Sequence, residues 1–289
     1  MFRLVATKDP TAVEVEVQRA YLTAYPHGNQ MFVPQVFGWA IDCFTGNYAD
    51  YQAIDAQYHD FEHTLQGTLC MARLMRGRYL AGAQPIVSEK LFQLGVIAIL
   101  LHDTGYLKHK GDHHGTGAKY TVIHVRRSAD FAAELLTQKH YPAQDIKAVQ
   151  NMILCTGVNA VLDAIPFQSE EEKIVGFALG ASDLLGQMAA VDYVDKLPVL
   201  YSEFEEAARH EHGRNKTVGM FSSAADLRQK TPDFWDNYVK PKLDNDFLGL
   251  YRFLEDPKSP GHNQYIDRIE KNINRLRDEL AANQSVVAN

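Results

Sequence analysis

The sequence predicts an all-α protein, for two reasons. Apolar residues recur every three or four positions along most of the chain, and convincing alternation of apolar and polar residues is scarce. The one alternating stretch, residues 13–17, suits either a short strand or the beginning of a helix. The 289 residues contain no internal repeat, low-complexity tract or clear linker. We therefore expect one helical domain over residues 1–289.

Two apolar helices stand out in the first half of the chain. One begins near His63 and carries an apolar face at positions 65, 69, 72 and 75. Gly82 and Pro85 then interrupt the helical pattern. Ser88 is a suitable N-cap for the next helix, which runs to Leu101 and is apolar on almost every side. A helix with so little polar surface should lie in the protein core.

The later elements follow from start and stop signals. We expect helices at about residues 120–138 and 145–155, and a loop over residues 108–118. Ser169 and Glu172 fit a capping box that opens another apolar helix. Residues 200–235 are more polar and should be partly irregular. The C-terminal helix, at about residues 262–284, carries an apolar stripe that should pack on the body of the protein, with homodimerisation as the alternative.

Composition and charge narrow the function. The formal net charge of −7 disfavours a protein that binds nucleic acid through its phosphates, whereas a bound metal could supply positive charge for a small phosphorylated substrate. Three cysteines, none in a CxxC pair, favour a reducing compartment. The sequence begins without a signal peptide and has no run of roughly 18 apolar residues. We therefore expect a cytoplasmic protein without a membrane partner.

The sharpest chemical feature is the dipeptide His102-Asp103 at the end of the apolar helix. A histidine and a carboxylate that emerge from an apolar run need a partner, because a buried unpaired charge is costly. Both side chains are good ligands for Zn, Mn or Fe. The alternative for an isolated pair is a helix-terminal histidine beside an aspartate that caps the next turn.

Two further positions strengthen this prediction. His59 and His63 are four residues apart, so on a helix they would share a face and provide two ligands, or one ligand beside one acid. Asp183 interrupts an apolar helix, where a buried carboxylate needs a cation, hydrogen bonds or a metal. Its alternative is a bond to the neighbouring Ser182 or to a helix end. Together, these residues on three apolar helices indicate a metal site.

The order of these residues resembles the HD superfamily of metal-dependent phosphohydrolases. The resemblance rests on His63, His102-Asp103 and Asp183 and covers roughly residues 50–245. The segment from Tyr58 through His63 is more particularly similar to the cyclic-nucleotide phosphodiesterase branch. The resemblance implies a fold, an HD-domain or phosphodiesterase-like helical bundle around a metal site.

The resemblance also implies a role for each residue. His63, His102, Asp103 and Asp183 would bind a first divalent metal, and Asp103 would bridge to a second. His124, 21 residues after Asp103, is the candidate ligand of the second metal, with a histidine on a helix face as the alternative. The metals (Zn, Mn, Mg or Fe) would activate a water for attack on phosphorus, and His59 would protonate the leaving oxygen.

Substrate recognition is less sharply indicated. Lys119 and Thr116 lie in a glycine-rich loop and could bind a phosphate, although the loop matches no P-loop. Phe234 lies in a segment similar to the one whose phenylalanine stacks on the purine in cyclic-nucleotide phosphodiesterases. Thr231 stands where those enzymes carry a glutamine. We expect a phosphodiesterase acting on a (cyclic) nucleotide or a similar small phosphoester.

Three other functions remain open. A nucleotide triphosphohydrolase or nucleotidase would use the basic residues near the motif, which are Lys108, Lys110, Lys119, Arg126 and Arg127. A di-iron oxygenase would need a sixth ligand, at the place where Cys155 stands. A regulatory HD module without turnover would be recognised by a lack of bound metal.

Overall fold

The computed structural model describes residues 4–210, 221–256, 259 and 261–287, and every regular element in these residues is helical. The predicted all-α fold is therefore confirmed. The α-helices are α1 (Pro10–Ala24), α2 (Phe32–Phe44), α3 (Phe61–Leu80), α4 (Glu89–Leu101), α5 (His124–Gln138), α6 (Ala143–Ile153), α7 (Glu170–Met188), α8 (Tyr193–His210), α9 (Ala224–Phe234) and α10 (Gln264–Val287).

Short helical turns connect these elements. The 3₁₀ turns are η1 (Thr104–Tyr106), η2 (Gly117–Tyr120), η3 (Leu154–Thr156), η4 (Leu162–Ala164) and η7 (Leu250–Leu254). Two π-helical turns, η5 (Trp235–Val239) and η6 (Lys242–Asp246), follow α9.

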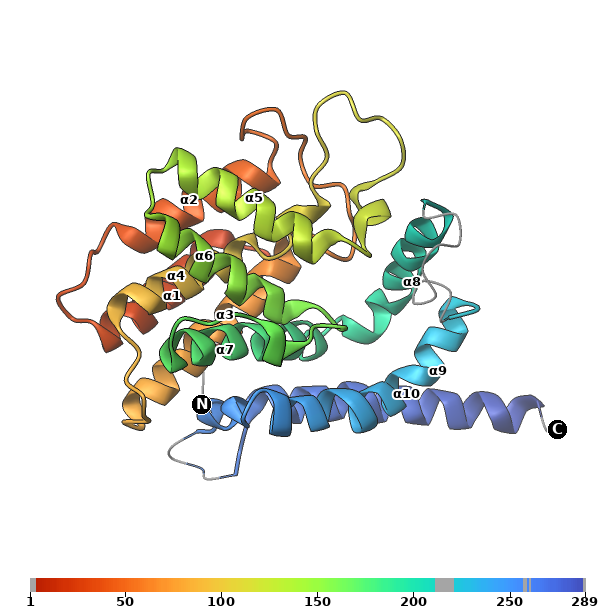
Figure 1. Cartoon of the computed structure of the whole chain (residues 1–289). Coiled ribbons are helices and arrows are strands. Elements are labelled where there is room, and N and C mark those ends of the chain that lie inside the picture. Colours follow the sequence, from red (N-terminus) through yellow and green to blue (C-terminus); the bar gives the residue numbers. More distant parts are fainter. Residues whose placement is uncertain (1–3, 211–220, 257–258, 260, 288–289) are drawn as a thin grey trace.

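Helices α3 and α7 pack against each other at the centre of the molecule (Figure 1). A methyl group on Gly186 of α7 would lie 2.7 Å from the backbone nitrogen of Gly67 of α3. This position must therefore be glycine for the two helices to approach so closely. His63 lies one turn before Gly67 and Asp183 lies one turn before Gly186, so the same crossing brings these two side chains together.

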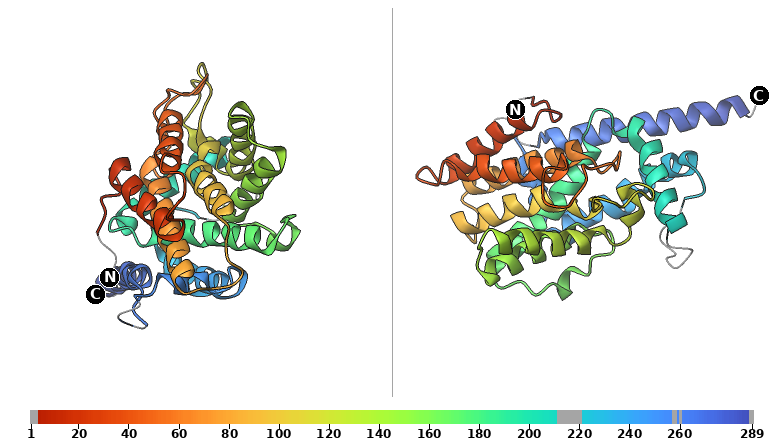
Figure 2. Two further views of the ribbon diagram at one scale, coloured as in Figure 1. Left: turned by 90° about the vertical axis from the view of Figure 1, so that its left-hand side faces the viewer. Right: turned by 90° about the horizontal axis from the view of Figure 1, so that it is seen from above.

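Helix α10 runs along one side of the molecule, and its C-terminal end extends beyond the other helices (Figures 1 and 2). Ile269, Ile273 and Leu276 are fully buried, and the helix packs against α7, α8 and α9. The prediction that this apolar stripe packs on the body of the protein is confirmed.

The predicted starts of α4 and α7 are confirmed, and each has a serine side chain as its N-cap. The Ser88 hydroxyl accepts a hydrogen bond from Leu91 N, and the Ser169 hydroxyl accepts one from Glu172 N. The capping box is only half formed, because the Glu172 carboxylate accepts from Gln168 N and from the side-chain amide of Asn151.

Three sequence predictions need correction or completion. The undecided stretch at residues 13–17 is helical and belongs to α1. The helix predicted from residue 120 begins at His124, because Thr116 caps the separate turn η2 before it. The segment predicted to be partly irregular contains most of α8 and all of α9, and residues 211–220 between them lie outside the described residues.

No single helix among the described residues is long and apolar enough to cross a membrane. Helices α7 and α8 together would be long and apolar enough, but the chain bends by 111° between them.

Candidate metal centre

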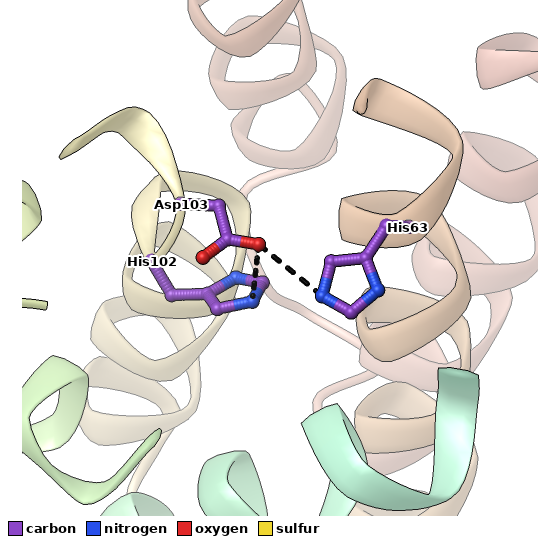
Figure 3. Close-up of side chains that lie close together, drawn as sticks. All are labelled: His63, His102 and Asp103. Carbon is purple, nitrogen blue, oxygen red and sulfur yellow. Dashed lines mark ion pairs between the residues drawn. The ribbon is translucent and has the colours of Figure 1, made fainter. Parts of the chain in front are cut away.

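The four predicted first-metal ligands lie together, and we call them the His/Asp cluster: His63, His102, Asp103 and Asp183. His63 Nε2 lies 3.2 Å from Asp103 Oδ2 and 3.2 Å from Asp183 Oδ1. His102 Nε2 lies 3.3 Å from Asp103 Oδ2 and 3.4 Å from Asp183 Oδ1. Figure 3 shows His63 on α3 facing the pair at the end of α4. All four side chains are buried.

The end of α4 directs His102 and Asp103 toward α3 and α7. The Thr104 hydroxyl donates a hydrogen bond to Leu101 O, so this carbonyl at the helix end has a partner. A methyl group on Gly105 would lie 2.0 Å from His124 O, so glycine at this position lets α5 begin beside the turn. The Asp103 carboxylate makes no capping hydrogen bond. The capping alternative for this residue is therefore not observed.

The donor atoms of His63, His102 and Asp103 lie close enough together to hold one metal ion, and Asp183 contacts the two histidines. His102 Nδ1 contacts Ile99 O at 2.7 Å, so Nδ1 carries a proton and Nε2 is the nitrogen that a metal would bind. His102 Nε2 and Asp103 Oδ2 are buried without a well-directed hydrogen bond. Neighbouring ligands of one ion lie about 2.8–3.8 Å apart, from octahedral to tetrahedral sites, when the metal–ligand bonds are about 2.0–2.3 Å long. The observed spacings match that range, and His63, His102 and Asp103 form a group that could hold a metal ion.

Protons balance the charges of this cluster in the absence of a metal. Burial by itself would lower the pKa of His63, but the carboxylates of Asp103 and Asp183 raise it to about 10. The same balance raises the pKa of His102. Burial would raise the pKa of each carboxyl group, yet the two histidines hold the pKa of Asp103 and of Asp183 well below the usual range. A divalent cation can replace these protons without leaving a net buried charge.

His124 lies beside the cluster rather than in it. Its Nε2 is 3.8 Å from Asp103 Oδ1, and its Nδ1 contacts Thr121 O at 2.5 Å. Burial lowers the pKa of His124, which favours the neutral ring that binds metals. The rings of His59 and His124 both stack on Tyr106, at centroid distances of 4.5 Å and 4.6 Å. His124 is therefore close enough to Asp103 to contact it, and its role as a second-metal ligand stays a prediction.

His59 does not share a helix face with His63. Helix α3 begins at Phe61, because the Asp60 carboxylate caps it by accepting from His63 N at 2.8 Å. His59 therefore precedes the helix, and this part of the prediction is wrong. The two rings still lie 5.4 Å apart, since the extended backbone at Asp60 turns His59 back toward the cluster.

Glu203 of α8 is a site residue that the sequence did not identify. Its Oε2 lies 2.6 Å from His59 Nδ1, and its Oε1 accepts from the backbone nitrogens of Gln57 and Tyr58 at 2.8 Å and 2.7 Å. Burial would raise the pKa of Glu203, but His59 and these hydrogen bonds lower it. Glu203 lies 144 residues after His59 in a polar helix. A carboxylate on a polar helix carries no local signal of such a contact.

Lys119 and Phe234, the two predicted substrate-binding residues, face partners within the protein. The Lys119 ammonium donates to both oxygens of Asp112, at 2.8 Å and 2.7 Å, and to His114 O at 2.7 Å. Phe234 stacks on Tyr238, with ring centroids 4.9 Å apart. Binding of a phosphate by Lys119 would require this ammonium to leave Asp112.

Cys155 is also directed away from the cluster. Its thiol is buried, donates to Asn151 O at 3.6 Å, and has a pKa raised by burial. A ligand role needs a thiolate, which this surrounding disfavours.

Comparison with known proteins gives one family. Residues 11–254 match a family model described as Npun_R2479-like, which covers the whole cluster and its surrounding helices. No curated protein matches the chain.

Proposed function

The chain belongs to the Npun_R2479-like family, and we propose that it is a metal-dependent phosphohydrolase, most specifically a phosphodiesterase for a nucleotide-like small phosphoester. The observation that carries the proposal is the His/Asp cluster, in which His63, His102 and Asp103 could hold a metal ion and Asp183 contacts both histidines. Two of the ligand atoms lack a well-directed hydrogen bond. The resemblance of the same residues to HD-type phosphohydrolases supports it.

Each residue has a defined part in this proposal. His63, His102, Asp103 and Asp183 would hold the first divalent metal, and Asp103 with His124 would offer ligands to a second. Bound metals of this kind lower the pKa of a water toward about 7 and neutralise phosphoryl charge. The protonated ring of His59 would deliver a proton to the leaving oxygen.

Glu203 supports the proposed role of His59. Because Glu203 Oε2 accepts from His59 Nδ1, the other ring nitrogen is left to carry the proton that is transferred. Despite burial, the pKa of Glu203 is lowered by His59 and by the backbone hydrogen bonds that it accepts, so the carboxylate stays charged as the acceptor of His59 Nδ1. A histidine and a buried carboxylate arranged in this way form a general-acid pair.

The surroundings favour a phosphodiester with a single negative charge over a triphosphate. A triphosphohydrolase would need several cations free to bind the polyphosphate, and each basic residue near the motif has a protein acceptor. These pairs are Lys108 with Asp55, Lys110 with Ala49 O, Lys119 with Asp112, Arg126 with Asp130, and Arg127 with Gly105 O and Leu107 O. The oxygenase alternative gains no support either, because Cys155 points into the core.

We propose the cytoplasm as the compartment of the protein. Cys43, Cys70 and Cys155 are all free thiols in the structure, which suits a reducing environment.

The decisive experiment combines turnover with metal content. Hydrolysis of bis(4-nitrophenyl) phosphate and of a panel of cyclic nucleotides would be measured with Zn²⁺, Mn²⁺, Mg²⁺ or Fe²⁺. Asp103→Asn should lose turnover together with bound metal. His59→Asn should keep its metal and lose turnover mainly on cyclic nucleotides, because 4-nitrophenolate leaves without a general acid. His113→Asn, at an exposed histidine, is the matched control.

One result would reject the proposal. If the wild-type protein binds metal in a stoichiometric amount and hydrolyses no phosphoester of either kind, the phosphohydrolase assignment is wrong. Equal losses on both substrate types in His59→Asn would reject the general-acid role alone.

A further inference from the structure

Helix α8 carries two carboxylates that bind two separate loops beside the candidate site. Glu203 and Glu206 are three residues apart, so they lie on one face of the helix. Glu203 binds the segment of residues 57–59 through two backbone nitrogens and one ring nitrogen. Glu206 binds Thr116, with Oε1 accepting from the backbone nitrogen at 2.5 Å and Oε2 accepting from the hydroxyl at 2.7 Å.

The two loops are also bound to each other. Asp55 Oδ1 accepts from Gly117 N at 2.7 Å, and Asp55 Oδ2 lies 2.7 Å from the Lys108 ammonium. The same ammonium donates to Gly115 O at 2.7 Å. Helix α8 therefore binds residues 57–59 and Thr116, and Asp55 and Lys108 connect these two segments to each other.

The backbone of the second loop is shaped for this contact. Gly115 has a φ of +58°, a conformation that side chains rarely adopt, and a methyl group there would lie 2.5 Å from Glu206 Oε1. The glycine at this position thus permits a carboxylate of the protein itself to reach the loop. The sequence suggested that such close approach served a phosphate, whereas in the structure the partner is Glu206.

Pro198 separates the distal part of α8 from the anchored first turn. The first turn buries Tyr193, Val194 and Leu197, but after Pro198 the buried side chains are Glu203 and Ala207. Proline has no N–H to donate to the carbonyl four residues earlier, and Val194 O accepts instead from Arg228 at 2.7 Å. The helix therefore lacks one backbone hydrogen bond at Pro198, and the carboxylates of its distal part hold it to residues 57–59 and to Thr116.

We propose that the distal part of α8, residues 198–210, is a clasp whose closure through Glu206 and Thr116 holds Glu203 on His59. Glu206 is then a positioning residue, which acts on His59 through the helix and through Glu203. The coupling between the two loops stands on these contacts alone, while its consequence for turnover rests on the proposed function.

The test measures amide hydrogen exchange, which requires neither metal nor activity. In Glu206→Ala, the amides of Thr116, Gln57 and Tyr58 should all exchange about tenfold faster or more, because release of one loop also releases Glu203. Glu206→Gln retains one acceptor and should restore most of the protection. Glu205→Ala removes an exposed carboxylate paired with Arg209 on the same helix, so it should leave all three amides unchanged.

The alternative results would overturn the clasp. If Glu206→Ala speeds exchange at Thr116 only, Glu206 is a local loop contact without influence on His59. If none of the three amides changes, the contact contributes nothing to closure. Thr116→Val removes the hydroxyl partner but keeps the backbone bond to Glu206 Oε1, so it should speed exchange at Gln57 and Tyr58 in the same direction as Glu206→Ala and by a smaller factor.

A turnover measurement separates this inference from the proposed function. If the protein hydrolyses phosphodiesters, Glu206→Ala should lower kcat on cyclic nucleotides more than on bis(4-nitrophenyl) phosphate, with metal content unchanged. If the wild-type protein has no such activity, the exchange result still decides whether the clasp exists.

Discussion

Replacement of Asp183 by asparagine tests the His/Asp cluster most directly. Asp183 lies in the middle of α7, and asparagine keeps its shape while removing the charge that faces His63 and His102. The variant should lose stability in the metal-free protein and should lose most of the stabilisation that a metal gives. Both effects can be worked out from the contacts of the cluster.

The metal-free effect follows from the pKa of His63. The rise in the pKa of His63 from 6.5 to about 10 corresponds to about 5 kcal/mol, which is the attraction of the two carboxylates less the cost of burial. Asp103 and Asp183 lie at equal distances from His63 Nε2, so Asp183 accounts for about half of this net value, or roughly 2.5 kcal/mol. At pH 7 the metal-free Asp183→Asn variant should be less stable by about this amount.

The metal effect follows from mass action. At a metal concentration 100 times the Kd, the wild-type protein should gain about 2.7 kcal/mol of unfolding free energy. Loss of one ligand should weaken binding by about 100-fold or more, so the variant should gain only about 0.4 kcal/mol at the same concentration. Denaturant unfolding with and without Zn²⁺ or Mn²⁺ measures both quantities, and Glu170→Gln, exposed at the start of α7, is the control.

A single outcome would refute this reasoning. If Asp183→Asn and Glu170→Gln gain the same stability from the metal as the wild-type protein, Asp183 is not a ligand. The converging side chains would then form a proton-balanced ion cluster in the core.

The other predictions concern the pKa of His63, the pair of His59 and Glu203, and the glycine of the loop that contacts the clasp. Because the pKa of His63 is higher in the folded protein than in the unfolded chain, its contribution to stability is complete below pH 6.5 and is lost as the pH rises to about 10. The metal-free protein should therefore unfold at a lower denaturant concentration at pH 10 than at pH 7. Calorimetry in buffers of different ionisation enthalpy should show that metal binding at pH 8 releases protons. Glu203→Gln should lower turnover of cyclic nucleotides by about 10²-fold in steady-state assays without altering metal content, whereas an unchanged rate would rule out its support of the general acid. Gly115→Ala should destabilise the protein more than Gly82→Ala in urea unfolding. The two positions have similar φ values of +58° and +63°, but only the first would bring a methyl group against Glu206, so equal losses would indicate backbone strain alone.

The sequence by itself determined the apolar helices α3, α4 and α7, whereas it predicted the segment of α8 and α9 to be partly irregular. Apolar spacing and local caps such as Ser88 and Ser169 act within one turn, so the pattern of residues contains the information that they need. The same locality made His102-Asp103 and Asp183 recognisable, since each is a polar residue in an apolar run. A local cap also explains why the predicted shared helix face of His59 and His63 is wrong. Asp60 caps α3, so the helix begins after His59.

Tertiary structure decided which distant groups meet. The close crossing of α3 and α7 at Gly186 brings His63 to Asp183, and the 111° bend after α7 carries Glu203 to His59. It also assigned Lys119 to Asp112 rather than to a ligand. Contacts of this kind depend on crossing angles and on side chains far apart in the chain, and neither is encoded by a periodicity of three or four residues.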